Sequence, residues 1–254
     1  MAYQRKVYGQ AEAAVDEIKK HILQHDLQSG DPLPTENQLC EHLGMSRTVV
    51  REAIRTLTAL RIVEVRHGRG TFVGDLSMQP MVESLVFRGL LNPGEDAQSL
   101  RDIVEVRASL DLSVGEEVIA AWQGRHSPKL HRTVEKMLEL ADAGQTFPQE
   151  DRFFHSQLLA PLPNQLFRRL TEAFWDVNTL IAPSLGIPTP ADIIVTARAH
   201  GQILEAAEQG NLDAYHAAVR EHYQPLLNNL DSLDARSEPG RKDRPPLPDH
   251  GITL

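Results

Sequence analysis

The chain has 254 residues, enough for two domains that each bury a core, and its 41% apolar and 24% charged residues are typical of a globular protein. Its single cysteine, Cys40, excludes an internal disulfide, and we therefore expect a reducing compartment. No apolar run is long enough to span a bilayer, and the segment MAYQRKVYGQ lacks the apolar core of a signal peptide, so we expect a cytoplasmic protein without a membrane partner.

The net charge of −9 is unevenly distributed along the chain. Between Met45 and Thr71 six arginines accompany only two glutamates, whereas the residues after Gly74 include sixteen basic and twenty-six acidic ones. A basic surface confined to one short segment is the electrostatic signature of a nucleic-acid contact. The acidic remainder of the chain is not expected to surround DNA.

An amphipathic helix is expected from Ala11 to His25, because apolar residues recur there on one helical stripe: Ala14, Val15, Ile18, Ile22 and Leu23. A turn from Asp26 to Pro34 follows. Thr35 and Gln38 then form the pattern of a capping box, which marks the start of a second helix, and Gly44 ends that helix.

Ser46 is placed to cap a third helix, whose apolar residues keep a helical period: Val50, Ile54, Leu57 and Leu60. This period leaves a separate face to four polar residues: Arg47, Thr48, Arg51 and Arg55. Arg47 and Arg51 lie one turn apart, so both can enter the major groove, where a guanidinium binds guanine or clamps a phosphate. The ordinary alternative is an amphipathic helical pair whose arginines only solvate a surface.

A β-hairpin is expected directly after this helix. The segment from Ile62 to Val65 alternates as a strand, a glycine-rich turn covers Arg66 to Gly70, and Thr71 to Val73 supplies the returning strand. Glycine at the tip allows the backbone to approach DNA closely, and His67 and Arg69 can reach phosphate or the minor groove. Helix, turn, helix and hairpin in this order predict a winged helix-turn-helix.

Three separated blocks, LPTENQL, LGMSRTVVREAIRTL and VRHGRGTFV, resemble the operator-binding domain of the GntR family of bacterial repressors, over roughly Tyr8 to Val73. The resemblance implies a double-stranded DNA operator as partner, contacted by the third helix and by the tip of the wing. The candidate DNA-binding residues are Thr35, Asn37, Arg47, Thr48, Arg51, His67, Gly68 and Arg69. Many members of the family have arginine in place of Asn37, so we expect a different or weaker contact at that position.

The second half of the chain reads as entirely helical. We place a DNA-binding domain at 1–76, a helical effector-binding and dimerisation domain at 77–234, and a disordered tail, rich in proline and charge, at 235–254. Glycine, proline and asparagine mark the breaks between helical segments. The predicted helices are at about 80–91, 98–122, 127–143, 147–160, 164–182, 190–208 and 211–233. This pattern predicts an antiparallel helical bundle and, for the whole chain, a mainly α fold.

Four polar residues of the bundle form a candidate metal site. Asp151 and His155 are four residues apart on one helix and share a face, while His200 and His222 lie at similar distances on either side of the turn at Gly210–Asn211. Three imidazoles and a carboxylate suit Zn²⁺, with Ni²⁺ or Mn²⁺ as alternatives, and leave positions for water or a ligand. By spacing alone, each residue could equally be an ordinary hydrogen-bonded side chain.

The segments DRFFH and AHGQILEAAEQGNLDAYHAAVREHY resemble the FCD effector domain of the FadR-type branch of the same family. That resemblance implies that the four residues hold a metal ion inside the bundle. It also implies that Arg107, in SLRDIVEVRASLDLSVGEEVIAA, faces the cavity and binds the carboxylate of an effector, because a planar guanidinium matches a carboxylate in bidentate fashion. Relatives commonly have glutamate in place of Asp111, and the alternative for Arg107 is a surface ion pair with Asp111.

Together these expectations predict a DNA-binding transcriptional regulator. We expect a homodimeric repressor that binds a palindromic operator, and we expect this repressor to sense a small organic acid bound between the metal and Arg107. One alternative is a metal sensor in which the ion itself is the signal. A metalloenzyme is not expected, because no additional base, nucleophile or oxyanion motif accompanies the ligands. A long acyl effector bound without metal is disfavoured by the complete ligand set. The effector, the operator and the sign of regulation stay open.

Overall fold

The computed structural model describes the backbone of residues 2–91, 96–184 and 193–234. The chain divides into two compact units, Met1–Pro80 and Met81–Leu254, and each is described by itself. Over these described residues the fold is mainly helical with one two-stranded sheet, which confirms the predicted fold class. Within the described ranges, no helix combines the length and the apolar character needed to cross a bilayer. The tail predicted at 235–254 lies outside the described residues.

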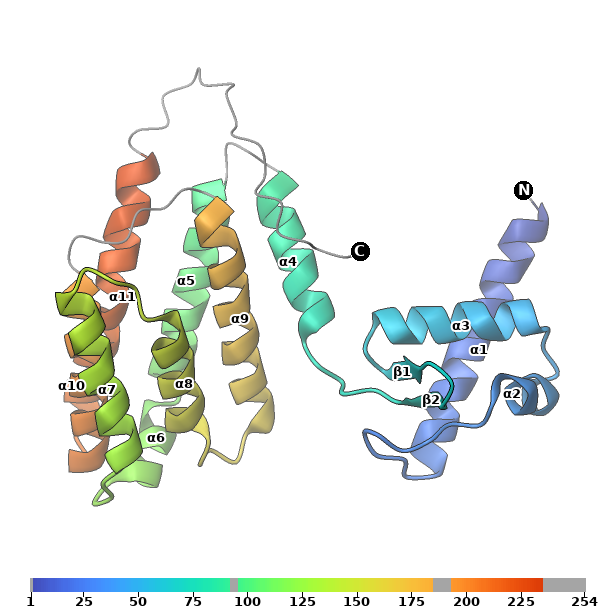
Figure 1. Ribbon diagram of the computed structural model, residues 1–254, viewed down its shortest axis with the longest axis horizontal. Helices are drawn as coiled ribbons and strands as arrows, with labels where there is room; N and C mark the ends of the chain where they lie inside the picture. Colours follow the sequence, from blue (N-terminus) through green and yellow to red (C-terminus); the bar gives the residue numbers. More distant parts are fainter. Residues whose placement is uncertain (1, 92–95, 185–192, 235–254) are drawn as a thin grey trace. The chain divides into compact units, whose positions relative to one another are not determined.

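The first unit is a winged helix-turn-helix (Figure 1). Its elements are α1 (Ala2–Gln24), α2 (Glu36–Leu43), α3 (Arg47–Ala59), β1 (Val63–Arg66) and β2 (Gly70–Val73). The strands pair antiparallel, with Val63 opposite Val73 and Arg66 opposite Gly70. The first helix begins at Ala2, well before the predicted start at Ala11.

Local hydrogen bonds at the helix ends match the predicted caps. Thr35 Oγ1 accepts the N–H of Gln38 at 3.4 Å, and Gln38 Oε1 accepts the N–H of Thr35 at 2.9 Å, which completes the capping box of α2. Gly44 ends that helix in the left-handed conformation, with φ 61°, which glycine adopts without steric cost. Ser46 Oγ caps α3 by accepting the N–H of Val49 at 3.4 Å.

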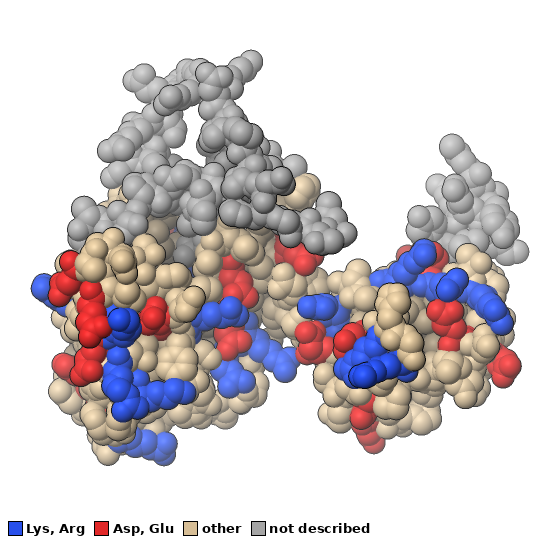
Figure 2. Space-filling model, in the orientation of Figure 1, with Lys and Arg blue, Asp and Glu red and all other residues tan. Residues whose placement is uncertain are grey.

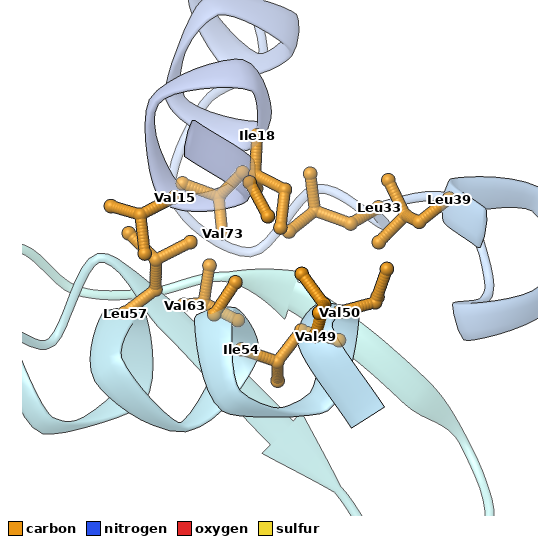
Figure 3. Close-up of a cluster of buried hydrophobic side chains, with 12 residues drawn as sticks. Val15, Ile18, Leu33, Leu39, Val49, Val50, Ile54, Leu57, Val63 and Val73 are labelled. Carbon is orange, nitrogen blue, oxygen red and sulfur yellow. The ribbon is translucent and has the colours of Figure 1, made fainter. Parts of the chain in front are cut away.

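The core of this unit is a cluster of aliphatic side chains from all three helices and both strands (Figure 3). It includes Val15, Ile18, Leu33, Leu39, Val50, Ile54, Leu57, Val63 and Val73. Leu23 and Leu60, predicted on the buried stripes, are instead 75% and 45% exposed. Leu23 lies next to the last residue of α1, and Leu60 is the C-cap of α3, so the regular helical faces no longer direct them into the core.

In the part of the second unit that the structure describes, every regular element is a helix (Figure 1). They are α4 (Gln79–Leu91), α5 (Asp96–Ser113), α6 (Gly115–Trp122), α7 (Pro128–Asp142), α8 (Pro148–Leu159), α9 (Gln165–Ser184), α10 (Ile193–Gln209) and α11 (Leu212–Asp234). Helices α10 and α11 form a hairpin, α10 also packs on α7, and α11 also packs on α5. Helix α8 lies between α7 and α9 in the packing, and α9 contacts α5.

The single helix predicted at 98–122 is wrong, because the chain breaks between α5 and α6. Side chains of α11 bind the carbonyls at the break: the hydroxyl of Tyr215 donates to the Asp111 carbonyl at 3.3 Å, and Nε2 of His216 lies 3.1 Å from the Leu112 carbonyl. A Cβ on Gly115 would lie 2.7 Å from Nε2 of His216, so a larger residue at this position would displace the His216 side chain. The break depends on contacts remote in sequence, and local periodicity does not reveal it.

Candidate functional site

The first unit presents all eight predicted DNA-binding residues to solvent. They are Thr35, Asn37, Arg47, Thr48, Arg51, His67, Gly68 and Arg69, and each is exposed. The core described above holds the opposite, apolar face of α3. Figure 2 shows Lys and Arg side chains gathered on the visible face of this unit. The arrangement can place a basic helix face and a hairpin tip against a phosphate backbone.

Two arginines of α3 are held by acidic neighbours. Nε of Arg51 lies 3.2 Å from Oε2 of Glu36 on α2, and Nη1 of Arg55 lies 2.6 Å from Oε1 of Glu52 on its own helix. Among the described residues, Arg47 has no ion-pair partner. Arg47 is therefore the guanidinium of this face that can bind an anion without first giving up an intramolecular partner.

The hairpin tip owes its shape to two glycines. Gly68 has φ +72° and Gly70 has φ +111°, backbone conformations that favour glycine. Behind the tip, the guanidinium of Arg66 bonds to Glu64 at 2.9 Å and lies 4.3 Å from the centroid of the Phe72 ring. Arg66 thus contacts side chains of both strands of the hairpin, whereas His67 and Arg69 lie at its exposed tip.

In the second unit the four predicted metal ligands come together. Asp151 and His155 are supplied by α8, His200 by α10 and His222 by α11. One potential ligand atom from each residue lies within 4.8 Å of the other three, so these four residues could hold a metal ion. The three histidines are buried and Asp151 is partly buried.

The hydrogen bonds around the cluster orient its side chains inward. Nδ1 of His200 lies 2.8 Å from the Thr196 carbonyl, which can only accept, so Nδ1 carries a proton and Nε2 is directed at the cluster. That Nε2 lies 2.8 Å from Oδ1 of Asp151, and Nε2 of His155 lies 3.6 Å from the same oxygen. The indole N–H of Trp175 donates to the other oxygen, Oδ2 of Asp151, at 2.5 Å.

The donor set fits a divalent cation. Nε2 of His155 and Nδ1 of His222 are buried and, within the described part of the chain, have no hydrogen-bond partner. An unpaired buried polar atom costs roughly 1–3 kcal/mol, and a cation between the rings would satisfy both atoms. Burial lowers the pKa of His155, and burial together with the neighbouring imidazoles lowers the pKa of His222 well below its ordinary value. Both rings are therefore neutral, which is the form that binds metals.

The carboxylate is ionised as a metal ligand requires. Burial would raise the pKa of Asp151, but the pKa lies well below its usual range, and the hydrogen bond with His200 is the largest of the effects that lower it. Carboxylate oxygens and imidazole nitrogens are both ligands that zinc and related ions accept.

A cavity of about 210 Å³ lies beside the cluster. Its polar lining includes Arg107, Thr146, Asp151, Thr179, Thr196, His222 and Tyr223, and its apolar lining includes Phe147, Trp175, Ile193 and Leu226. Asp151 and His222 therefore belong both to the possible metal site and to the cavity wall. A ligand in this cavity can contact a cation and a guanidinium at once.

Arg107 is in the wall of this cavity and not at the surface of the bundle. The residue is 4% exposed, its guanidinium carbon lies 5.5 Å from the centroid of the Tyr223 ring, and its Nε has no hydrogen-bond partner among the described residues. Asp111 instead accepts a 2.6 Å hydrogen bond from the Tyr223 hydroxyl. These positions rule out the surface ion pair between Arg107 and Asp111.

Sequence reasoning missed Trp175 and Tyr223. Burial and the nearby Asp111 raise the pKa of Tyr223 well above its ordinary value, so the phenol stays a neutral donor. The position of Tyr223 directly after His222, a candidate metal ligand, is a weak signal in the sequence that it lies near the site. Trp175 has no comparable signal, because α9 contributes no ligand of its own to the cluster.

Comparisons with known proteins agree with this organisation. Residues 10–73 match the model of the bacterial regulatory proteins of the gntR family, and residues 102–225 match the FCD domain. A putative transcriptional regulatory protein, NedR from Micromonospora viridifaciens, is 37% identical over 111 residues, which cover 44% of this chain and 80% of NedR.

Two further relatives extend over most of the chain. The galactonate operon transcriptional repressor of Escherichia coli K12 is 23% identical over 207 residues, which cover 80% of this chain and 88% of the repressor. The solved structure of Streptococcus agalactiae GntR has a TM-score of 0.62 and 26% identity, and the match covers 86% of this chain and 99% of that one. The chain therefore belongs to the GntR family of bacterial transcriptional regulators, with a DNA-binding domain followed by an FCD effector domain, and it is not an enzyme.

Proposed function

We propose that the chain is a repressor whose second unit binds a small hydroxy acid beside a divalent metal ion. The observation that carries this proposal is the composition of one cavity wall, in which Arg107 and two members of the four-residue cluster, Asp151 and His222, line the same space. A fixed cation and a buried guanidinium are complementary to a carboxylate.

Asp151, His155, His200 and His222 would hold the metal ion. Three imidazoles and one carboxylate favour Zn²⁺, and Ni²⁺ or Mn²⁺ are the alternatives. When bound, the ion supplies a positive centre that can accept a carboxylate or hydroxyl oxygen of the effector. The unpaired ring nitrogens of His155 and His222 support this assignment.

The cavity favours a compact, hydroxylated acid. Its volume of about 210 Å³ is below the range of roughly 300–1,000 Å³ that is usual for pockets of drug-sized ligands. Threonine hydroxyls at Thr146, Thr179 and Thr196 lie in its wall and can bond to hydroxyl groups of the effector. The similarity to a repressor named for a galactonate operon supports the same class of ligand.

The first unit would act as one half of a homodimer on a palindromic operator. Two copies place two recognition helices in successive major grooves, with Arg47, Thr48 and Arg51 toward the bases and the wing tip toward the backbone. The effector controls DNA binding because its affinity differs between the DNA-competent and the incompetent arrangements of the dimer. Release of DNA on effector binding is the behaviour expected of a repressor.

The test is the metal content of the protein, prepared without chelators or a metal-affinity tag and dialysed against metal-free buffer. About one tightly held ion per chain is expected, and a His200→Ala, His222→Ala double variant should lose it. A His42→Ala, His67→Ala double variant, which removes two exposed imidazoles from the first unit, is the matched control and should keep the ion.

A metal-loaded protein would then be screened against small carboxylates by thermal shift. Hydroxy acids should raise the melting temperature of the wild type and not that of the double variant. Absence of metal in the wild type, even after addition of Zn²⁺, Ni²⁺ or Mn²⁺, would overturn the metal-centred mechanism and leave the assignment as a DNA-binding regulator intact.

A further inference from the structure

A second group of potential metal ligands lies elsewhere in the second unit. His126 precedes α7, His131 belongs to α7, and Glu208 is near the end of α10. Oε2 of Glu208 lies 2.9 Å from Nε2 of His131 and 3.5 Å from Nδ1 of His126. The two imidazole rings stack with their centroids 4.4 Å apart. Two ring nitrogens therefore face one carboxylate oxygen.

The carboxylate is fixed in place by the backbone between α6 and α7. Its other oxygen, Oε1 of Glu208, accepts the N–H of Ser127 at 3.0 Å, and the Glu208 carbonyl accepts the N–H of Gly124 at 2.9 Å. Ser127 in turn caps α7 by accepting the N–H of Leu130 at 3.3 Å. These bonds hold Oε2 of Glu208 toward the two histidines, as outer hydrogen bonds do for metal ligands.

The distances suit a shared cation. Tetrahedral ligands at the usual zinc bond lengths of about 2.0–2.1 Å lie roughly 3.4 Å from one another. The contacts of 2.9 and 3.5 Å from Glu208 are close to that separation, and one atom from each of the three residues lies within 4.8 Å of the others. Only small side-chain movements are needed to place an ion between them.

The group is accessible, unlike the buried four-residue cluster. The side chain of His126 is 64% exposed, that of His131 is 32% exposed and that of Glu208 is 14% exposed. His200 and Glu208 share α10 and are separated by about 12 Å along its axis, at a rise of about 1.5 Å per residue. An ion at the second group is therefore separate from an ion at the first.

We propose that His126, His131 and Glu208 form a second divalent metal site, for Zn²⁺ or a similar transition-metal ion, with water in the remaining coordination positions. Imidazole and carboxylate ligands suit such ions. The site binds more weakly than the four-residue cluster, because it has one ligand fewer and the exposed His126 side chain must be ordered. An ion here links the start of α7 to the end of α10 and stabilises the folded unit by mass action.

The test counts the ions bound by the full chain. Metal-free protein is titrated with Zn²⁺ by calorimetry, and with Co²⁺ by visible absorption, which reports the coordination geometry of the bound ion. A His126→Asn, His131→Asn double variant should bind one equivalent fewer than the wild type. Glu208→Gln, which retains an acceptor for Ser127, should weaken the lower-affinity equivalent at least tenfold.

Glu205→Gln is the matched control, because Glu205 is exposed one turn earlier on α10 and has no part in the group. It should bind as many ions as the wild type. Equal numbers of ions in the wild type and the double histidine variant, with circular dichroism showing both folded, would overturn the proposal. The comparison does not depend on the four-residue cluster, because both proteins retain it.

Discussion

The indole N–H of Trp175 on α9 donates to Oδ2 of Asp151 on α8 at 2.5 Å, while Oδ1 of the same carboxylate lies 2.8 Å from Nε2 of His200. The carboxylate is therefore oriented by a helix that supplies no potential ligand to the four-residue cluster. Trp175 also lines the neighbouring cavity, so one side chain contacts both the metal-binding group and the space proposed for the effector.

Trp175→Phe should weaken metal binding without unfolding the protein. Phenylalanine keeps most of the aromatic packing but has no N–H, and loss of such an outer hydrogen bond typically lowers metal affinity about 10–100-fold. Competition with a chelator of known affinity measures the change. Trp122→Phe is the control, because the Trp122 N–H bonds to the Leu158 carbonyl at 2.8 Å and not to a potential ligand. Equal losses in both variants would contradict a specific role for Trp175.

Arg107→Gln should abolish the thermal shift produced by hydroxy acids and leave the metal content unchanged. Arg107 lines the cavity but is absent from the four-residue cluster. A hydrogen bond to a charged group contributes about 1.5–3 kcal/mol, so effector affinity should fall by roughly tenfold or more. Arg101→Gln, which removes an arginine of α5 paired with Asp231, should retain the shift. Loss of metal from Arg107→Gln would assign Arg107 a different role.

The parts of the fold that the sequence predicted are those with local signals. The capping box of Thr35 and Gln38, the end of α2 at Gly44 and the cap of α3 at Ser46 each involve residues close together in the chain. Helical spacing allowed the four residues of the cluster to share one site, and the resemblance to the FCD domain selected them. The structure brings the four together.

What the sequence could not predict depends on contacts between distant residues. Trp175 is 24 residues from Asp151, and Tyr223 is 112 residues from Asp111, whose carboxylate it binds. The sequence gives no signal that pairs His131 with Glu208, because the two residues are 77 positions apart. Helical periodicity reports which face of a helix is apolar, but it does not report which neighbouring helix covers that face.

Removal of the metal should lower the melting temperature of the chain. Without a cation, Nε2 of His155 and Nδ1 of His222 stay buried with no partner among the described residues, at a cost of about 1–3 kcal/mol for each such atom. Differential scanning calorimetry before and after dialysis against a chelator measures the effect, and restoration by Zn²⁺ is the control. An unchanged melting temperature would mean that the four-residue cluster contributes nothing to folding through a metal.

Leu57→Ala and Leu60→Ala should differ sharply in stability. Leu57 is 0% exposed in the core of the first unit, and truncation of a buried leucine costs about 2–5 kcal/mol. Leu60 is 45% exposed, and a surface change of this kind usually stays within about 0.5 kcal/mol. Urea denaturation, monitored by a probe in the first unit, measures both. Similar losses would show that the apolar period of α3 continues into the core at Leu60.

Arg47→Ala should weaken operator binding and reduce its dependence on salt. Arg47 is exposed on α3 and has no ion-pair partner among the described residues, so a phosphate can bind it directly. Loss of one phosphate contact lowers the slope of log K against log salt by about one, whereas loss of a base contact costs about 1–3 kcal/mol and relaxes specificity at one position. Fluorescence anisotropy at several salt concentrations, with operator and random DNA, separates the two.

Glu36→Gln is the companion variant, because Glu36 holds Arg51 at 3.2 Å. Because Arg51 must leave this carboxylate to reach DNA, the variant should bind operator more tightly than the wild type. Weaker binding would contradict this expectation and would mean that Glu36 orients Arg51 toward the DNA. Lys136→Gln, which removes an exposed positive charge from the second unit, should behave as the wild type in both measurements. An effect of Lys136→Gln as large as that of Arg47→Ala would contradict the assignment of DNA binding to α3, because net charge alone would then account for the change.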